Sequence, residues 1–317
     1  MQIQINSSYQ HIVNEIVNYT DLPAADVEHR LWMEILEMGW NVKEDAKRFG
    51  ITPHVYNDKM ETLYKEGYGL IFETILYWAR PERQDWIKKA LDRINLYTKL
   101  NNIPPEKVSI LMLGDGGGSD SLYLINNGFK VNYFDIPGSK TYDFAIKRFE
   151  KHGVLGKQVQ LITDYNQCLK SEYDIVLSFE VLEHLTDPLQ AIKDINSMLK
   201  LGGLALITEG FGVVADYHPT HLQSNLKYSH KTAFLFLKNK MRLSWYSKHS
   251  LFKPMEFNKI EGESILDLLK LWTDINVIRV YFYPKICATK ALLKKIFTFP
   301  KIVMKLFTNP STYASAK

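Results

Sequence analysis

The first residues of this chain that suggest chemistry are a glycine-rich segment and the acid that follows it. The apolar stretch 108–113 runs into Gly114-Asp115-Gly116-Gly117-Gly118, after which the spacing becomes helical. Glycines allow such a turn to adopt positive φ and approach a ligand closely, while the next helix presents unpaired N–H groups. Asp135 ends the next apolar stretch, where a carboxylate can accept hydrogen bonds from both hydroxyls of a ribose. We therefore expect an adenosine-containing cofactor at this loop.

The loop and the acid suit both NAD and S-adenosylmethionine. A dinucleotide needs backbone donors for its diphosphate, whereas S-adenosylmethionine carries an ammonium, a carboxylate and a sulfonium, and favours acids or carbonyls near its amino-acid end. Three later segments favour the second cofactor: 160–165, 173–188 and 198–209. In the first of them, Asp164 is placed to accept a hydrogen bond from the adenine amine, and Tyr165 is placed to cover the ring.

Taken in order, these segments resemble the class I S-adenosylmethionine-dependent methyltransferases over residues 107–285. The resemblance is strongest to the branch with a Glu-His-Leu-x-Asp-Pro segment, here 183–188, found among small-molecule and quinone-biosynthesis enzymes. It implies a Rossmann-like α/β fold with a mostly parallel sheet of seven strands, and S-adenosyl-L-methionine as the cofactor. The residues that it places along this cofactor are Gly114, Gly116 and Gly118 at the methionine end, Asp135 at the ribose, Asp164 near adenine, and Phe179 and Glu180 after the fourth strand.

One position departs from this pattern. The family usually has Asp or Glu two residues before the first glycine, and this chain has Met112. Either Asp115 compensates through a different geometry, or the affinity for the cofactor is reduced. Met112 keeps open a methyltransferase-like subunit that binds cofactor without catalysis. The loop and Asp135, which would also serve NAD, keep open a nicotinamide-dependent oxidoreductase.

Histidines after the fifth predicted strand are the candidate catalytic residues. The segment 216–222 reads Asp-Tyr-His-Pro-Thr-His-Leu, and related enzymes often carry Pro-x-His in this loop near the substrate. Because an imidazole accepts a proton near neutral pH, His221 is the first candidate base and His218 the second, while His184 is equally suited to a structural role. We expect methyl transfer to a small-molecule, glycan or lipid-linked acceptor, on oxygen in preference to nitrogen or carbon.

Two other kinds of chemistry are less well supported by the sequence, a metal site in this segment and thiol catalysis by a cysteine. Asp216, His218 and His221 lie close together in the sequence, but a His-x-x-His pair in a loop that contains proline lacks the fixed i, i+4 geometry of a helical metal motif. We therefore expect no metal ion. Neither Cys168 nor Cys287 has an adjacent histidine or a paired cysteine, which argues against nucleophilic thiol catalysis.

Residues ~21–100 have helical spacing. We expect a helix over 27–39, two further helices between 60 and 100 interrupted at Arg80-Pro81, and a linker at 101–105. The segment 45–52 weakly suggests a helix-turn-helix, but its surroundings hold as many acids as bases, so we expect no nucleic-acid binding. We interpret 1–104 as a helical cap that selects the acceptor. The aromatic residues that can line it, at least half of which we expect in the core, are Tyr56, Tyr64, Tyr68, Phe72, Tyr77 and Trp78.

Beyond Lys107, short apolar strands alternate with helices, which is typical of an α/β domain. The predicted strands are 108–113, 130–134, 159–162, 173–178 and 204–208, with 242–246 and 276–283 as candidate closing strands. The predicted helices are 120–127, 141–152, 187–199 and 261–272. We assign 105–285 to the cofactor-binding domain.

Charge is unevenly distributed over the 317 residues. The net charge is +4, yet from Ile275 onward there are eight Lys or Arg and no Asp or Glu, against 31 basic and 35 acidic residues in 1–274. The tail 286–317 interleaves lysines with apolar residues and is suited to peripheral contact with an anionic membrane surface, or to packing on the domain. No apolar run is long enough to span a bilayer, and the first residues lack signal-peptide features, so we expect a cytoplasmic enzyme.

Overall fold

The computed structural model describes residues 3, 5, 8–247 and 253–261. Residues Met1–Glu263 form one compact unit and Ser264–Lys317 a second. The second unit, and with it the predicted helix 261–272 almost entirely, the predicted strand 276–283 and the basic tail, lies outside the described residues. In the described part of the chain, no helix combines the length and the apolar character needed to cross a membrane.

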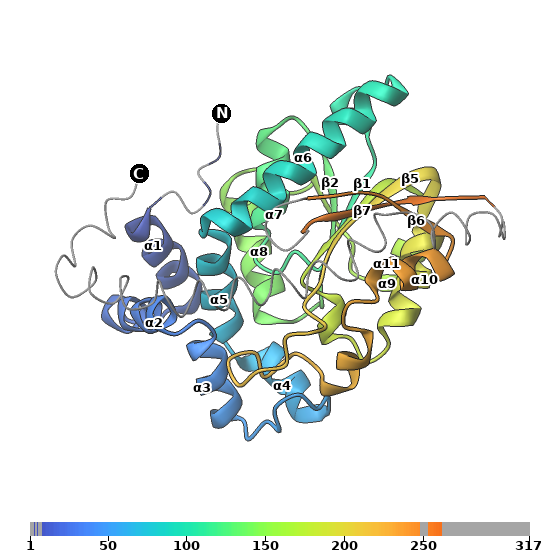
Figure 1. Cartoon of the computed structure of the whole chain (residues 1–317). Coiled ribbons are helices and arrows are strands. Elements are labelled where there is room, and N and C mark those ends of the chain that lie inside the picture. The colour runs from blue at the N-terminus through green and yellow to red at the C-terminus, as the bar shows by residue number, and fades with distance from the viewer. Residues whose placement is uncertain (1–2, 4, 6–7, 248–252, 262–317) are drawn as a thin grey trace. The chain divides into compact units, whose positions relative to one another are not determined.

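Six helices precede the sheet in the described chain (Figure 1). They are α1 (Tyr9–Thr20), α2 (Ala24–Leu36), α3 (Trp40–Arg48), α4 (Asp58–Glu66), α5 (Gly69–Trp78) and α6 (Pro81–Asn101). The predicted break at Arg80-Pro81 is confirmed, because Pro81 opens α6 where its missing N–H costs no hydrogen bond. Three helices rather than two occupy the region from 58 to 101. The chain turns at Gly67 after α4, and α5 begins at Gly69.

A sheet of seven strands follows, in the order β3-β2-β1-β4-β5-β7-β6. Its strands are β1 (Ile110–Leu113), β2 (Val131–Phe134), β3 (Val159–Leu161), β4 (Tyr173–Phe179), β5 (Leu199–Thr208), β6 (Met241–Tyr246) and β7 (Met255–Lys259). β1 to β5 run parallel, and β7 pairs antiparallel with both β5 and β6. This is the predicted mostly parallel α/β sheet. The closing strand β7 was not predicted, and β5 begins at Leu199 rather than Leu204 because it continues through the double glycine.

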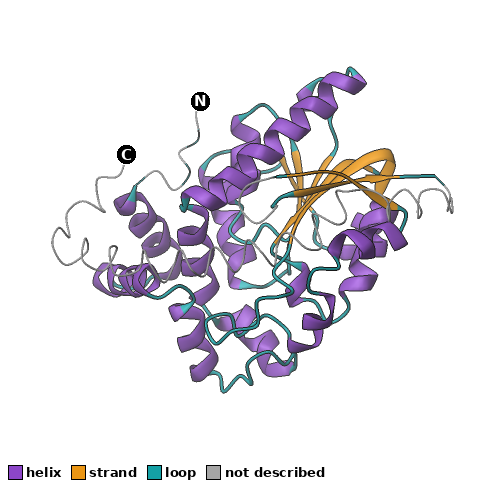
Figure 2. Cartoon of the chain, viewed as in Figure 1, coloured by secondary structure: helices purple, strands orange, loops and turns teal. Residues whose placement is uncertain are grey.

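Helices cover both faces of the sheet (Figure 2). Those inserted between strands are α7 (Ser119–Asn126), α8 (Lys140–Lys151), α9 (Tyr165–Leu169), α10 (Pro188–Met198) and α11 (Thr232–Lys238). α6, α7 and α8 share one core with strand residues such as Ile110, Tyr133 and Leu177, while α10 packs on β4 and β5 from the other side. A second core joins α1, α2 and α5 to Phe144 of α8. The N-terminal helices therefore pack directly against the α/β part of the chain through a shared apolar core.

Candidate active site

The glycine loop lies between β1 and α7 and needs glycine at both ends. Gly114 and Gly118 have φ of +82° and +75°, values that side chains with a Cβ rarely adopt. A Cβ on Gly114 would lie 2.5 Å from Val181 Cγ2, and one on Gly118 would lie 2.6 Å from Phe149 Cζ. The loop is thus packed against Val181, which follows β4, and against Phe149 of α8, and these contacts fix its position at the carboxyl end of β1.

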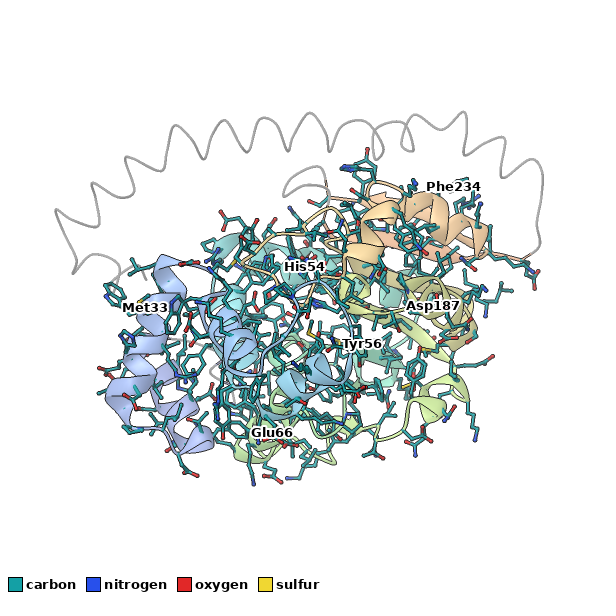
Figure 3. The ribbon with its side chains drawn as sticks, turned by 90° about the horizontal axis from the view of Figure 1, so that it is seen from below. Met33, His54, Tyr56, Glu66, Asp187 and Phe234 are labelled. Atoms are coloured by element: carbon teal, nitrogen blue, oxygen red, sulfur yellow. The ribbon has the colours of Figure 1, made fainter. Side chains whose placement is uncertain are left out.

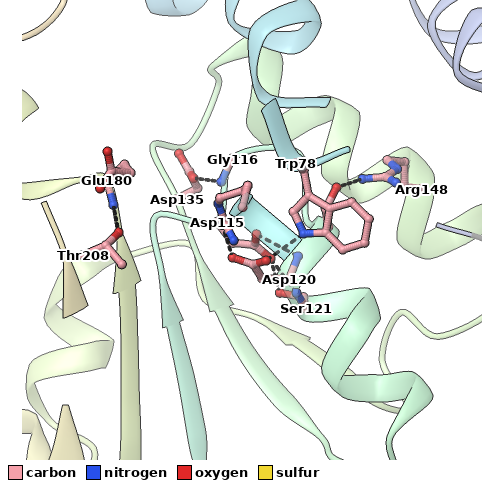
Figure 4. Close-up of polar contacts among 11 residues, drawn as sticks. Trp78, Asp115, Gly116, Asp120, Ser121, Asp135, Arg148, Glu180 and Thr208 are labelled. Atoms are coloured by element: carbon pink, nitrogen blue, oxygen red, sulfur yellow. Dashed lines mark hydrogen bonds and ion pairs between the residues drawn. The ribbon is translucent and has the colours of Figure 1, made fainter. Parts of the chain in front are cut away.

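Three side chains hold the loop backbone in place. The hydroxyl of Tyr133 donates to the carbonyl of Gly116 at 2.6 Å, and Nη1 of Arg148 donates to the carbonyl of Gly117 at 2.6 Å. Asp135, at the end of β2, accepts the N–H of Gly116 at 2.6 Å (Figure 4). Burial raises the pKa of Asp135, and its backbone hydrogen bonds oppose that rise. The predicted ribose acid is therefore beside the loop, and its first role is to brace it.

Asp115 points into the first turn of α7. Its carboxylate accepts the N–H of Asp120 at 3.1 Å, and the N–H and hydroxyl of Ser121 at 2.7 and 2.6 Å. Burial, and then the charge of Asp120, raises the pKa of Asp115 to about 7. Met112, the position at which the resemblance leads us to expect an acid, is 2% exposed in the sheet core. Asp115 caps the first turn of α7.

Arg83 of α6 is a site residue that sequence reasoning missed. It forms a buried ion pair with Asp120, which also accepts the indole N–H of Trp78 at 2.8 Å. Its guanidinium lies 5.3 Å from the centroid of the Phe179 ring. Nη1 of Arg83 is buried with no hydrogen-bond partner, and Arg83 lines the cavity at the glycine loop. A buried donor of this kind calls for a hydrogen-bond acceptor, which no other group of the described chain supplies.

Phe179 ends β4, and Glu180 follows it directly. Glu180 has φ +56°, and its N–H donates to Oγ1 of Thr208 at 3.0 Å (Figure 4). Its carboxylate accepts from Nζ of Lys253 at 2.5 Å. Burial alone would raise the pKa of Glu180, but the ammonium of Lys253 outweighs it and lowers the pKa. Glu180 is therefore held as an anion at the cavity wall.

Asp164 and Tyr165 lie after β3, away from this cavity. Asp164 is exposed and caps α9 by accepting the N–H of Asn166 at 2.9 Å. The Tyr165 hydroxyl donates to Asp194 at 2.9 Å, and its ring lies 5.4 Å from that of Phe134. Neither side chain lines the cavity described below. Their predicted contacts with adenine stay predictions.

A cavity of about 170 Å³ lies between the glycine loop, the N-terminal helices and the segment 216–222. We call this segment, which contains His218 and His221, the histidine loop. Its walls include Gly114 to Gly117 and Glu180 on the sheet side, Leu70, Glu73, Tyr77 and Trp78 on α5, and His184, His218 and His221. Of the six aromatic residues singled out above, Tyr77 and Trp78 face the cavity, whereas Phe72 is fully buried in the helical core.

The histidine loop is fastened to the N-terminal helices by backbone contacts. His54, in the loop between α3 and α4 (Figure 3), donates its N–H to the carbonyl of Pro219 at 2.8 Å and accepts the N–H of Gln223 at 3.0 Å. Its Nδ1 is 2.9 Å from the carbonyl of His221. A Cβ on Gly39 would lie 1.9 Å from the carbonyl oxygen of Tyr217. The cap and the histidine loop therefore pack without space between them.

Both predicted catalytic histidines lie in the cavity wall. The rings of His218 and His221 stack at 4.5 Å with an angle of 6° between their planes. Nδ1 of His218 is 3.2 Å from Oε1 of Glu73 on α5. Burial, and then the nearby His184 and His218, lowers the pKa of His221 to about 2. Asp216 is exposed, so the sequence cluster of Asp216, His218 and His221 separates into one surface acid and two cavity residues.

Fold and site together define the class of protein. A Rossmann-like sheet with a glycine loop at the carboxyl end of β1 and an acid at the end of β2 binds an adenosyl cofactor at this edge. The glycine loop and the unpartnered donor of Arg83 line the same cavity at this edge. These features are those of a class I methyltransferase.

Comparison with known families agrees. Residues 75–256 match a family model described as a methyltransferase domain, and the chain belongs to this family. Membership of this family favours S-adenosylmethionine as the cofactor over a nicotinamide dinucleotide. Residues in the cavity that bind this cofactor are predictions from geometry, while the cofactor itself follows from the family.

Individual relatives are more distant. The chain is 28% identical over 134 residues to a ubiquinone biosynthesis O-methyltransferase of Actinobacillus pleuropneumoniae serotype 7 (strain AP76), covering 41% of this chain and 52% of that protein. The match thus spans about half the relative's length. Among solved structures, the DszA carbon methyltransferase gives a TM-score of 0.50 at 13% identity over 76% of this chain and 71% of its own. An O-methyltransferase family protein from Burkholderia thailandensis gives 0.44 at 13% identity, over 79% and 73%. The likeness to DszA shows the fold alone.

Proposed function

We propose that the enzyme methylates a hydroxyl oxygen of a small-molecule, glycan or lipid-linked acceptor bound under α5. The observation that carries this proposal is that one cavity is lined by the glycine loop, by Arg83 and by the Glu73–His218 pair. Donor and acceptor subsites are thereby contiguous, as an in-line displacement requires. The similarity to a ubiquinone biosynthesis O-methyltransferase, together with the resemblance to the Glu-His-Leu-x-Asp-Pro branch, supports oxygen and a hydrophobic or lipid-linked acceptor.

Bound S-adenosylmethionine would supply the methyl group. In this transfer a bond forms between the acceptor oxygen and the methyl carbon while the carbon–sulfur bond breaks, and the electron pair of the broken bond stays on sulfur. The acceptor hydroxyl must lose its proton. We assign this step to His218, because a Nδ1–H directed at Glu73 leaves Nε2 as the acceptor and the carboxylate would stabilise the imidazolium. His221, the first sequence candidate, has a pKa lowered to about 2. His221 therefore does not hold a proton at neutral pH. We assign it to positioning of the acceptor and not to proton transfer.

The walls of the cavity favour an acceptor with an apolar part. Met38, Leu70, Tyr77 and Trp78 reach the cavity from the helical region. An acceptor ring packed on them would exclude water from the sulfonium, and the cap held by His54 would keep it excluded. We therefore interpret residues 1–104 as the acceptor-selecting cap and 105–285 as the cofactor domain.

Two measurements test the activity. Isothermal titration calorimetry should detect binding of S-adenosylhomocysteine to the protein and no binding of NAD. Metabolite extracts incubated with enzyme and S-adenosylmethionine should yield a product heavier by one CH2, whose proton and carbon spectra distinguish a methoxy group from N-methyl or C-methyl. Binding of S-adenosylhomocysteine with no methylated product in any extract would contradict the proposed reaction.

The base is tested by His218→Gln and Glu73→Gln, with His29→Gln on the exposed side of α2 as control. We expect His218→Gln to lower kcat by roughly 10²–10⁴-fold, and Glu73→Gln to lower it less and shift the acidic limb of the pH–rate profile. The affinity for S-adenosylhomocysteine should stay within about threefold. Equal losses of turnover and of cofactor affinity would remove His218 from proton transfer.

A further inference from the structure

Glu15 is a buried acid in α1, far along the chain from the glycine loop. The apolar side chains Ile12, Val13 and Ile16 of this helix pack into the helical core, and Glu15 is buried beside them. A carboxylate is costly to bury without an opposite charge. That charge comes from α8, because Oε2 of Glu15 lies 3.3 Å from Nε of Arg148 and both side chains are 2% exposed. The pair therefore joins α1 to α8 inside the protein.

The same guanidinium holds the glycine loop (Figure 4). Nη1 of Arg148 donates to the carbonyl of Gly117 at 2.6 Å and to Oγ of Ser119 at 2.8 Å. Because a peptide unit is planar, fixing the Gly117 carbonyl also fixes the N–H of Gly118, which donates to the carbonyl of Asp115 at 3.1 Å. Gly117 and Ser119 line the cavity. Arg148 thus holds, from the interior, a turn that faces the cavity.

A turn with three successive glycines, 116–118, needs anchors of this kind. Glycine has more backbone freedom than any other residue, and this freedom is lost when the loop takes one conformation. Tyr133, Asp135 and Arg148 restrict it through their bonds to the loop backbone. Arg148 differs from the other two, because its planar guanidinium is carried on a long side chain whose direction depends on its partners. Glu15 is the charged partner of Arg148 from α1.

We propose that Glu15 is a positioning residue for cofactor binding, and that it acts through Arg148 on the glycine loop. Among the described residues, the cavity wall includes none from α1, so Glu15 acts on the cofactor through the loop and not by contact. Glu15 also lies outside residues 75–256, which match the methyltransferase model. The inference concerns the cofactor and not the acceptor, so it stands whether or not the methyl group goes to oxygen.

The rival explanation is that the ion pair only fastens α1 to the rest of the chain. Under that explanation, any substitution that loosens α1 to the same extent has the same effect on cofactor affinity. Under ours, the loss of affinity is specific to Glu15. Val13→Ala is the matched variant, because it removes apolar contacts of the same helix from the core and leaves both charges in place.

Titration calorimetry of the full chain with S-adenosylhomocysteine measures the effect. We expect Glu15→Gln and Arg148→Met each to weaken binding by about tenfold or more, within the usual range for coupled sites. The double variant should bind no more weakly than Arg148→Met alone, because Glu15 acts through Arg148. Val13→Ala and Lys151→Gln should stay within about threefold of the wild type. Lys151 lies 3.8 Å from Oε1 of Glu15 but is 49% exposed, and exposed ion pairs contribute little.

Hydrogen exchange of the wild type is a second measurement that needs no variant. If α1 is coupled to the loop through Glu15, binding of S-adenosylhomocysteine must in turn stabilise α1. Exchange of the backbone amides in Tyr9–Thr20 should therefore slow when S-adenosylhomocysteine is added, and it should slow more than exchange in Ala24–Leu36, which shares the same core. Equal slowing in the two helices, or none, would overturn the proposal.

Thermal unfolding of every variant shows which of them fold. A folded Glu15→Gln chain that binds S-adenosylhomocysteine within threefold of the wild type would contradict the role of Glu15, and so would an equal loss in Val13→Ala. If Glu15→Gln does not fold, Glu15→Asp keeps the charge but withdraws the carboxylate by one methylene, and we expect binding to weaken by about threefold to tenfold. A wild type that yields no O-methylated product would leave this inference standing, because it is measured by S-adenosylhomocysteine binding alone.

Discussion

Asp115 shows how one carboxylate in the glycine loop affects stability. Its pKa is raised to about 7, so between about pH 4 and 7 the folded chain holds a proton that the unfolded chain has lost. Its contribution to stability is therefore present at low pH and is lost as pH rises through 7. The slope approaches ~1.4 kcal/mol per pH unit for one proton.

We expect the free energy of unfolding of wild type, relative to Asp115→Asn, to fall from pH 5 to pH 7 and then level off. Urea unfolding at four pH values measures it, with exposed Asp92→Asn as control. The comparison with a variant matters because buried histidines such as His221, whose pKa is lowered, give a slope of opposite sign. Parallel curves for wild type and Asp115→Asn would show that this carboxyl is ionised throughout.

Single residues also mark the limit of what spacing can predict. The glycine loop, Asp135, His218 and His221 could be found because each belongs to a short local pattern. Arg83 and Glu73 could not, because they reach the cavity from helices that show only amphipathic spacing. Glu183 belongs to the recognisable Glu-His-Leu segment. Its burial without a hydrogen-bond partner could not be predicted, because it depends on how the interior packs.

At the scale of elements, the β1–α7 turn has no room for a Cβ at Gly114 or at Gly118. We expect Gly118→Ala to lower the free energy of unfolding by roughly 2–4 kcal/mol, because it combines a positive φ with a 2.6 Å contact to Phe149. Gly128→Ala is the matched control, since φ is +88° there but nothing lies within 4 Å, and it should cost only about 1 kcal/mol. Chemical denaturation of the two variants measures the difference, and equal losses would show that the contact with Phe149 relaxes freely.

The contact between α2–α3 and the histidine loop should govern binding of the acceptor. Gly39→Ala places a Cβ against the carbonyl of Tyr217, so we expect the KM for the acceptor to rise by about tenfold or more while the affinity for S-adenosylhomocysteine stays within threefold. Gly50→Ala is the control, because its φ is also positive but its nearest neighbour is the flexible end of Lys59 at 3.5 Å. Steady-state kinetics should separate them. An unchanged KM in Gly39→Ala would mean that the cap does not select the acceptor.

Elements were predictable where the pattern was strong and local. The five parallel strands have short apolar runs bounded by turn residues, and they were located to within a few residues. β7 was missed because Met255-Glu256-Phe257-Asn258-Lys259 reads as a loop next to Pro254. Only its pairing with β5 and β6 makes it a strand.

At the scale of the whole molecule, Met1–Glu263 is a compact unit of its own. We propose that the basic tail serves a separate task, peripheral contact with anionic lipid at the inner face of the membrane. A chain ended at Glu263 should then unfold cooperatively and bind S-adenosylhomocysteine within about threefold of the full chain. Titration calorimetry and thermal unfolding check both points.

Sedimentation with vesicles of anionic lipid tests the tail itself. Only the full chain should be retained, and added salt should release it, because each lysine near the surface contributes about 1 kcal/mol. Vesicles of neutral lipid are the control. Equal retention of both chains, or of neither, would exclude the tail as a membrane anchor.

By itself, the sequence determined the fold class, the glycine loop and the two histidines that reach the cavity. These depend on backbone geometry and hydrophobic alternation within short segments, which neighbouring residues specify directly. Tertiary structure alone decided that Arg83 faces the glycine loop, that Glu73 supports His218, and that Glu15 meets Arg148. These groups come from separate segments, and their partners, burial and charge are set by how the helical cap and the sheet pack together.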